Sequence, residues 1–400
     1  MIGRIIKQNI ITKLFKGKAI ILLGPRQVGK TTLLKEIFNE RNDALWLNAD
    51  EPDIQALFEN ATSTRFKNYF GNHKIIVIDE AQTITDIGIK LKIIIDSLPE
   101  LQVIATGSSA FEIKNKTNEP LTGRKWQFQL FPFSFSELAN HHGLIEEKRM
   151  IPVRLLYGAY PEITLHQGEE KERLKLLSES YLYKDILMFE GLKMPEKLVH
   201  LLQLLAFRIG TEINYNNLSK ELKIDNATVE KYIKLLEDSF IIFRLKALSR
   251  NHAKELKKGR KIYFIDNGIV NVLLGNFNLP ENRADVGALW ENYVISEIYK
   301  KYRYENRWAN FYFWRTQDQQ EIDLVIEENQ VFHAFEIKWN QNAKARLSKT
   351  FSRNYENHQF NVINPSNVEE FLLKKIISPF GMYHYNTSPH PSSSPTFFSS

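Results

Sequence analysis

The 400-residue sequence contains no cysteine. That absence excludes disulfides, zinc fingers, cysteine–histidine proteases and iron–sulfur clusters, and it suits a reducing compartment, so we expect a cytoplasmic protein. The ten histidines never take the H-E-x-x-H spacing of a zinc hydrolase. The longest apolar runs are strand-sized, far short of the roughly 20 residues that a membrane helix needs, so the sequence predicts no membrane partner.

The composition is that of an ordinary globular protein, with 43% hydrophobic and 25% charged residues. Four hundred residues suffice for two or three domains with substantial cores. The net charge is +6 and the isoelectric point is near 9.0, which is compatible with a nucleic acid or another polyanion as partner without demanding one. The positions of the charges are therefore more informative than their sum.

An apolar run, residues 19–23, leads into a glycine-containing loop and then into a helical pattern. The loop and the helix start comprise Gly24, Pro25, Arg26, Gln27, Val28, Gly29, Lys30, Thr31 and Thr32. This order of strand, loop and helix is that of a P-loop, whose backbone N–H groups surround a phosphate chain. Lys30 would reach the β- and γ-phosphates, and the Thr31 hydroxyl would bind Mg²⁺. The motif predicts that the chain binds a nucleoside triphosphate.

A second apolar run, residues 75–78, ends in two carboxylates, as expected for a central parallel strand. In P-loop NTPases an acid at this strand tip holds the magnesium, often through water, which assigns Asp79 to metal binding. The adjacent Glu80 is the candidate general base for the attacking water. The two motifs together predict ATP hydrolysis with Mg²⁺ as cofactor.

Two further residues are candidates for this site. A third expected strand, residues 101–105, ends in small polar residues, among which Ser108 or Ser109 would orient the lytic water. Arg124 would stabilise charge on the γ-phosphate, either within its own chain or from a neighbouring subunit of a homo-oligomer. Simpler alternatives exist, because small polar residues end many strands and most arginines are solvated or in surface pairs.

Strand and helix alternate over residues 1–150, which predicts a parallel sheet covered on both faces. The expected strands lie near residues 20–24, 44–48, 75–79, 101–105 and 126–131, and a helix capped by Ser136 follows them. Residues 151–195 are expected to form a helical connector. The Ser/Pro-rich tail, residues 381–400, is expected to be disordered.

Residues 196–265 follow the order of a winged helix-turn-helix, in which Asp225 or Asn226 caps the second helix. From residue 244 to residue 261 the chain carries eight Lys or Arg and one acid, as a basic hairpin wing would. Because such a second helix enters a major groove, the expected partner is DNA rather than RNA. The predicted contact residues are Lys231, Lys234, Lys257, Lys258 and Arg260. The alternative is a winged helix used for protein packing.

Residues 266–380 hold a second candidate site. Asp323 stands on one expected strand, Glu336 and Lys338 lie two residues apart on the next, and Glu291 lies on the preceding helix. An acid followed by Glu-x-Lys is the arrangement of the PD-(D/E)xK nucleases, in which two acids bind Mg²⁺ and the lysine positions or deprotonates water. The proline of that motif is replaced by Ile322. The alternative is an ion pair on an antiparallel hairpin.

As a set, these residues resemble a known family. The segments GPRQVGKTTLL, IIVIDEAQ, LTGRKWQFQLFPFSFSEL, YLYKDIL, LWENYVISEI and FEIKW stand in the order found in prokaryotic AAA-type ATPases with a C-terminal domain of unknown function. The similarity covers about residues 15–375. It implies an AAA-like ATPase core, a winged helix and a PD-(D/E)xK-like end, with Lys30, Thr31, Asp79 and Glu80 keeping the roles given above.

The sequence thus predicts an α/β protein with an AAA-like P-loop NTPase domain, a helical and winged-helix middle and an α/β nuclease-like C-terminal domain. We expect an ATP-driven switch whose nucleotide state alters how the C-terminal half engages nucleic acid. Two interpretations of that half stay open: metal-dependent cleavage of DNA or RNA, or an idle nuclease-like fold through which ATP controls a protein or DNA complex. A small-molecule kinase is a weaker third, since nothing beyond the P-loop supplies an acceptor site.

Overall fold

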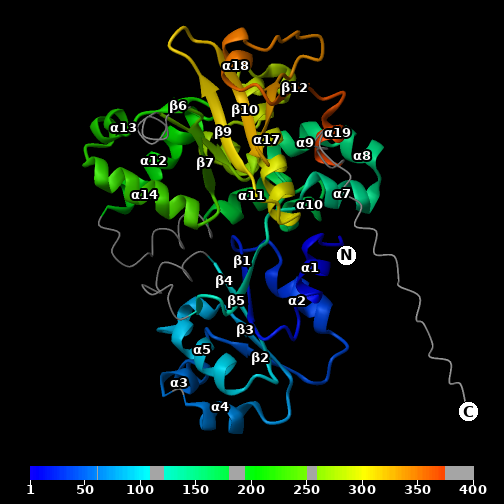
Figure 1. Cartoon of the computed structure of the whole chain (residues 1–400), viewed down its shortest axis with the longest axis vertical. Helices are drawn as coiled ribbons and strands as arrows, with labels where there is room; N and C mark the ends of the chain where they lie inside the picture. Colours follow the sequence, from blue (N-terminus) through cyan, green and yellow to red (C-terminus); the bar gives the residue numbers. More distant parts are fainter. Residues whose placement is uncertain (61, 109–120, 180–193, 250–258, 374–400) are drawn as a thin grey trace, which may run out of the picture.

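The structure, a computed structural model, describes residues 1–60, 62–108, 121–179, 194–249 and 259–373 (Figure 1). The tail that the sequence predicts to be disordered lies outside these ranges. Among the described helices, none is both long enough and apolar enough to cross a membrane.

The amino-terminal half is built on a parallel sheet, which has five strands within the described residues (Figure 1). These are β1 (Ala19–Leu23), β2 (Ala44–Asn48), β3 (Ile75–Asp79), β4 (Gln102–Gly107) and β5 (Lys125–Gln129), in the order β2-β3-β4-β1-β5. All four strand pairs are parallel. The predicted parallel α/β sheet is therefore confirmed, and β4 lies between the P-loop strand β1 and the acidic strand β3.

Helices cover both faces of this sheet, because alternate residues of its strands enter two different hydrophobic cores. Ile20 and Leu22 of β1 join the core that includes the helix after the loop, whereas Ile21 and Leu23 join the core on the opposite face. The helices are α1 (Ile6–Ile11), α2 (Lys30–Phe38), α3 (Pro52–Glu59), α4 (Ser63–Phe70), α5 (Ile87–Ser97) and, after β5, α7 (Phe135–His142).

The cap of α7 differs from the prediction. Its N-cap is Ser134, whose hydroxyl accepts a hydrogen bond from the Glu137 backbone N–H at 3.3 Å, while the Glu137 carboxylate accepts from the Ser134 N–H at 2.9 Å. Predicting Ser136 as the cap was wrong, because this reciprocal box needs serine three residues before glutamate. Ser136 lies inside the helix and donates to the Leu372 carbonyl at 3.1 Å.

The middle of the chain is helical. Its helices are α8 (Leu144–Arg149), α9 (Ile151–Tyr157), α10 (Pro161–Thr164), α11 (Glu170–Leu177), α12 (Pro195–Phe207), α13 (Tyr215–Leu222) and α14 (Asn226–Asp238). Asp225 caps α14 by accepting from the Thr228 N–H at 2.8 Å, so this part of the prediction is confirmed.

A seven-stranded sheet in the described residues organises the C-terminal half. Its strands are β6 (Glu212–Ile213), β7 (Ile242–Ala247), β8 (Arg260–Phe264), β9 (Asn310–Arg315), β10 (Glu321–Glu328), β11 (Val331–Ile337) and β12 (His358–Ile363), in the order β12-β11-β10-β9-β7-β8-β6. The parallel pair β7–β9 joins the segment predicted as a winged helix to the segment predicted as nuclease-like. The two predicted segments therefore share one sheet.

The remaining helices are α16 (Asn267–Leu274), α17 (Val286–Tyr304), α18 (Lys349–Asn354) and α19 (Val368–Leu372). The long helix α17 connects the two halves of the molecule at its C-terminal end. The Tyr304 hydroxyl accepts a hydrogen bond from the Phe131 N–H at 3.1 Å, and the Tyr304 carbonyl accepts from the Asn9 side chain at 2.7 Å. Glu297, also on α17, accepts from the Phe135 N–H at 2.7 Å. Polar contacts thus fix α17 to the end of the first domain.

Candidate nucleotide-binding site

The loop between β1 and α2 needs glycine at two positions for different reasons. A Cβ atom on Gly24 would lie 2.1 Å from the Leu130 carbonyl oxygen, so only glycine lets the loop leave β1 beside the residue that follows β5. Gly29 has φ +89°, a left-handed conformation that side chains other than glycine rarely adopt. The chain therefore turns tightly before α2 begins at Lys30.

Lys30 is almost completely buried, with 5% of its surface exposed. Its ammonium donates to the carbonyl oxygens of Gly24 and Pro25, both at 3.0 Å. The lysine thus lies over the inner side of the loop. There its ammonium group can bind phosphate oxygens in place of the two backbone carbonyls.

The Thr31 hydroxyl donates to the Asp79 carboxylate at 2.7 Å. The P-loop threonine and the acidic strand tip are therefore in direct contact, although 48 residues separate them. Both are hard oxygen donors of the kind that Mg²⁺ prefers. Glu80 follows with φ +51°, an uncommon conformation for glutamate that turns the chain directly after β3.

Thr106, which the sequence analysis did not single out, links the two acids. Its hydroxyl donates to Asp79 and accepts from the Glu80 backbone N–H at 3.1 Å. The signal that could have found it is register, since Ile78 pairs with Ala105 and the next residues of the two strands are Asp79 and Thr106.

The remaining candidates for the ATPase site are Ser108 and Arg124, since Ser109 lies outside the described residues. Ser108 lies two residues beyond Thr106, half-buried. Arg124 precedes β5 at the opposite edge of the sheet, where its carbonyl accepts from the Ala19 N–H at 2.9 Å. Its side chain donates to exposed Asp96 at 2.8 Å. Assigning Arg124 to the P-loop of its own chain is wrong for this structure, because Arg124 lies at the start of β1 and β5 and the P-loop follows the end of β1. A role from a neighbouring subunit stays a prediction.

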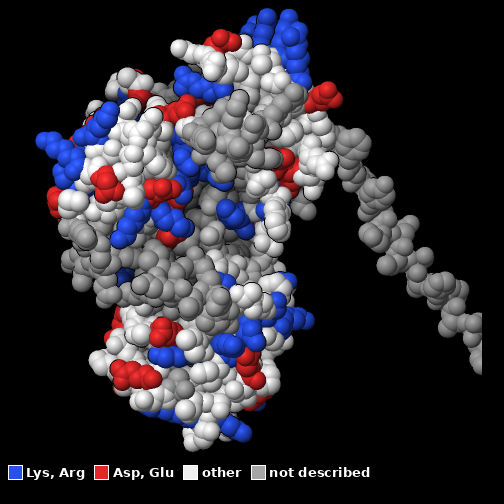
Figure 2. All heavy atoms as spheres, turned by 60° about the vertical axis from the view of Figure 1, so that its left-hand side comes forward, with Lys and Arg blue, Asp and Glu red and all other residues white. Residues whose placement is uncertain are grey.

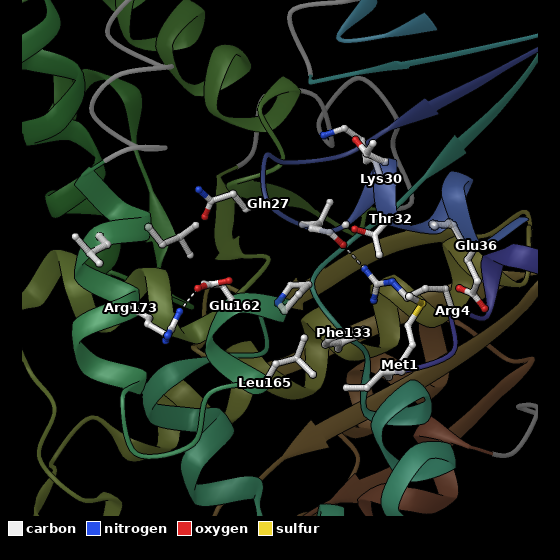
Figure 3. Close-up of a pocket in the computed structure, with 18 of the residues that line it drawn as sticks. Met1, Arg4, Gln27, Lys30, Thr32, Glu36, Phe133, Glu162, Leu165 and Arg173 are labelled. Atoms are coloured by element: carbon white, nitrogen blue, oxygen red, sulfur yellow. Dashed lines mark hydrogen bonds and ion pairs between the residues drawn. The ribbon is translucent and has the colours of Figure 1, made fainter. Parts of the chain in front are cut away.

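A cavity of about 830 Å³ opens in front of the loop (Figure 3). The predicted residues that line it are Gln27, Val28, Gly29, Lys30, Thr31, Thr32 and Glu80. The opposite wall comes from the chain's start, from Phe133 and from α10 and α11, including Arg4, Glu162 and Arg173. The sequence analysis missed this wall, because nothing in residues 1–18 or in α10 and α11 has the pattern of a phosphate-binding motif.

Arg4 connects the wall to the loop. Its guanidinium donates to the carbonyls of Val28 at 2.7 Å and Phe131 at 2.8 Å, and it pairs with the buried carboxylate of Glu137 at 3.0 Å. Figure 3 shows Arg4 beside the loop and Arg173 with Glu162 at the other side of the cavity. Arg173 is paired with Glu162 and Glu169, and its pKa is raised chiefly by the hydrogen bond to Glu169.

Negative charge accumulates at the C-terminal ends of β2 and β3. Burial raises the pKa of Asp50, and the nearby carboxylates of Glu80 and Asp79 raise it further, while Arg26 opposes them. In the described part of the chain no three acids or histidines group around one point as a protein-only metal site would. That fits Mg²⁺ in a nucleotide site, which takes one or two protein oxygens and completes its shell with phosphates and water.

The second predicted site is also brought together. Lys338 lies 2.6 Å from a Glu336 carboxylate oxygen and 3.4 Å from Asp323, which also accepts from the Ile337 N–H at 2.8 Å. Burial and the neighbouring Asp323 raise the pKa of Glu336. The predicted strand pair is confirmed as β10–β11.

Glu291 joins this cluster from α17. It accepts from the Tyr263 hydroxyl at 2.6 Å and lies 3.5 Å from Lys261, which pairs with Glu321 at 2.5 Å. Burial raises the pKa of Glu291 to about 7, against the attraction of Lys261. The sequence analysis did not assign a place in this cluster to Lys261, Tyr263 and Glu321. Their contacts join β8 to α17 and to β10, which lie far apart in the sequence. The carboxylates are paired with lysines, and the Mg²⁺ expected at this cluster stays a prediction.

The residues predicted to contact nucleic acid are only partly described. Lys231 and Lys234 are exposed on α14, and Lys234 pairs with Asp238 at 2.5 Å. Arg260, at the start of β8, lies over the Tyr215 ring at 5.2 Å. Lys257 and Lys258 fall outside the described residues.

P-loop NTPases are defined by a P-loop after the first strand of a parallel sheet and by a P-loop threonine that lies beside an acid at the end of another strand. This chain has both features, the second in the contact of Thr31 with Asp79. Residues 16–139 match the family model described as an AAA domain. Two further models, each described as a domain of unknown function, match residues 149–279 and 286–383. Residues 16–139 are therefore similar to AAA domains and have the fold of a P-loop NTPase.

Similar proteins are known from bacteria and archaea. An uncharacterized protein of Mycobacterium tuberculosis is 24% identical over 330 residues, covering 81% of this chain and 71% of the relative. One of Methanocaldococcus jannaschii is 23% identical over 384 residues, covering 90% and 84%. Among solved structures, a Walker-type ATPase of Pyrococcus abyssi has a TM-score of 0.47 at 17% identity, covering 68% of this chain and 96% of that one. Cdc6p of Pyrobaculum aerophilum has 0.28 at 14%, covering 68% and 93%.

Proposed function

We propose that the chain is a Mg²⁺-dependent ATPase. The contact of the Thr31 hydroxyl with the Asp79 carboxylate at 2.7 Å carries this proposal. It places two magnesium-type oxygen donors beside a loop whose lysine is already directed inward.

Each residue has a distinct task in this proposal. Lys30 holds the phosphate chain, and Thr31 and Asp79 hold the cation, which neutralises charge on the β- and γ-phosphates when bound. Glu80 accepts the proton of the attacking water. The Thr106 hydroxyl orients the Asp79 carboxylate and holds the backbone of Glu80.

Phosphate release from ATP tests the proposal. Glu80→Gln should retain Mg-ATP binding in calorimetry and lose turnover by about 100-fold or more, because it removes only the base. Glu59→Gln, an exposed change of the same kind on α3, is the matched control and should turn over ATP like the unchanged protein. Lys30→Ala should abolish binding. Unaltered turnover in Glu80→Gln would remove the base assignment, and ATP binding that survives Lys30→Ala would remove the site.

We further propose that ATP controls nucleic-acid binding by the C-terminal half. The order of α12, α13 and α14 followed by the antiparallel pair β7–β8 supports a winged helix, with exposed Lys231 on its second helix. Helix α17 supports the coupling, since it carries Glu291 near one end and Tyr304, bonded to Phe131 beside Arg4, at the other.

The pairing of every carboxylate in the second cluster with a lysine or tyrosine favours binding without cleavage over a nuclease. Incubation of the full chain with plasmid DNA or RNA and Mg²⁺ or Mn²⁺ should leave both intact. Cleavage that disappears in Asp323→Asn but persists in the exposed control Asp318→Asn would establish the nuclease instead.

A further inference from the structure

We infer that the segment after β11, residues 338–353, is a docking surface for the phosphate backbone of a nucleic acid. The inference rests on the proposed nucleic-acid binding and assigns it a surface away from the predicted wing. The segment contains five cationic residues and no acid: Lys338, Lys344, Arg346, Lys349 and Arg353.

Three of these cations are available to an external partner. Lys344, Arg346 and Lys349 are exposed, and none of them forms an ion pair with an acid in the described ranges. Lys338, by contrast, is committed to Glu336 and Asp323. Three exposed cations without acidic neighbours in sequence repel one another, which raises their attraction for a polyanion.

The segment is held by the fold rather than extended into solvent. Phe351 is fully buried, and its ring packs against Trp314 at 5.3 Å and Tyr355 at 4.8 Å between centroids. Ser348 accepts from the Thr350 N–H at 3.1 Å and donates to Gln320 in the turn between β9 and β10. The cations flank this anchored core, so ordering them for binding costs little further entropy.

Sheet topology places the start of the segment at the same end of the C-terminal sheet as the start of β8, with β10, β9 and β7 between β11 and β8. Strands β7, β9 and β11 run in one direction, and β8 and β10 run in the other. The C-terminal ends of β7, β9 and β11 and the N-terminal ends of β8 and β10 therefore lie at the same end of the sheet. That end of the sheet carries Arg260, the start of the 338–353 segment and Arg315, which is paired with Glu212 at 3.9 Å and Glu321 at 3.8 Å.

The shape of this cationic surface indicates which kind of anion would bind to it. It lies near α18 at the upper end of Figure 1, and Figure 2 shows Lys and Arg side chains gathered at that end. A linear polyphosphate meets such a row of cations repeatedly, and each contact releases counterions. A nucleic-acid backbone therefore fits this surface better than a compact anion does.

Fluorescence anisotropy with a labelled DNA duplex of about 30 base pairs tests the inference, with salt varied from about 50 to about 200 mM. The full-length triple variant Lys344→Gln, Arg346→Gln, Lys349→Gln is compared with Lys16→Gln, Lys67→Gln, Lys74→Gln. The control removes the same charge from exposed positions of the AAA-type domain. The first variant should lower the slope of log K against log salt by about 2–3, since each lost phosphate contact removes about 0.9. The control should keep the original slope.

Equal slopes for the two triple variants would overturn the inference while leaving nucleic-acid binding elsewhere on the chain. If the unchanged protein binds no duplex even at about 50 mM salt, both this inference and the proposed nucleic-acid binding are wrong. ATP turnover without DNA, measured on the same samples, keeps either failure separate from the ATPase. Loss of binding to phosphatidylserine vesicles, with DNA binding unaffected, would assign the surface to a membrane and refute the inference. Circular dichroism checks that both variants are folded.

Discussion

The guanidinium of Arg4 donates a 2.7 Å hydrogen bond to the carbonyl of Val28 in the P-loop. The same side chain pairs at 3.0 Å with Glu137, whose carboxylate is fully buried. One residue near the start of the chain therefore fixes the loop from outside and compensates a buried charge.

We predict that Arg4→Ala lowers the free energy of unfolding by about 3–5 kcal/mol, because it leaves the Glu137 carboxylate buried without its cation. Arg41→Ala, which breaks the exposed pair with Asp43, should cost no more than about 1 kcal/mol. Urea unfolding measures both. A loss in Arg4→Ala as small as that of the control would show that Glu137 does not depend on this arginine.

Thr106→Val should reduce ATP turnover by about 10- to 100-fold while changing the affinity for Mg-ATP only a few-fold. Valine keeps the shape of the threonine side chain but removes the hydroxyl that contacts both Asp79 and the Glu80 N–H. The expected loss corresponds to about 1.4–2.8 kcal/mol of barrier. Steady-state kinetics check it against Thr64→Val, an exposed position on α4. Parallel losses of affinity and turnover would point to a structural effect instead.

Gly24→Ala should weaken Mg-ATP binding by at least about 10-fold, or about 1.4 kcal/mol. The added methyl would lie 2.1 Å from the Leu130 carbonyl, so the loop must move. Gly3→Ala is the matched control, because a Cβ there has no neighbour within 4 Å. Calorimetry measures both affinities, and a Gly24→Ala protein that binds like Gly3→Ala would contradict the tight fit of the loop on Leu130.

The pH dependence of stability should report on Glu291. Burial raises its folded-state pKa to about 7 from the ordinary 4.5, so between these values the folded state binds more protons than the unfolded state. The free energy of unfolding from this group therefore falls as pH rises from about 4.5 to about 7, by on the order of 2–3 kcal/mol. Tyr263, Lys261, Glu321 and Asp323 face the carboxyl.

Urea unfolding at about pH 5 and about pH 7.5, in the unchanged protein and in Glu291→Gln, measures this contribution. Glutamine can still accept from Tyr263 but does not titrate, so the variant should lose the fall in stability over this range. An identical pH profile in both proteins would mean that Glu291 stays ionised throughout.

Local patterns gave the parts of the fold that the sequence could predict. The strands from β1 to β5, the P-loop and the acids after β3 each depend on a few consecutive residues, and the structure contains those strands in the expected parallel sheet. The inner face of α14 was also predictable, since Val229, Tyr232, Ile233 and Leu236 repeat with helical spacing and are buried.

What the sequence did not predict depends on residues far apart in the chain. Thr106 becomes informative only through the register of β4 with β3, and Arg4 only through contacts at separations of 24 and 133 residues. The own-chain role of Arg124 was misjudged because its place just before a parallel strand puts it at the opposite end of the sheet from the P-loop. The pairing of β7 with β9 likewise joins segments that a linear inspection separates.

The pairing of β7 with β9 makes the segment predicted as a winged helix dependent on the rest of the chain. A protein truncated after residue 265 would leave the β9-facing side of β7 with unpaired N–H and carbonyl groups next to apolar side chains. An unpaired strand of that kind can form backbone hydrogen bonds with strands of other chains. Oligomers or aggregates are therefore the expected result of the truncation. A biochemist who wants the segment predicted as a winged helix in folded form should therefore retain the sequence through β12.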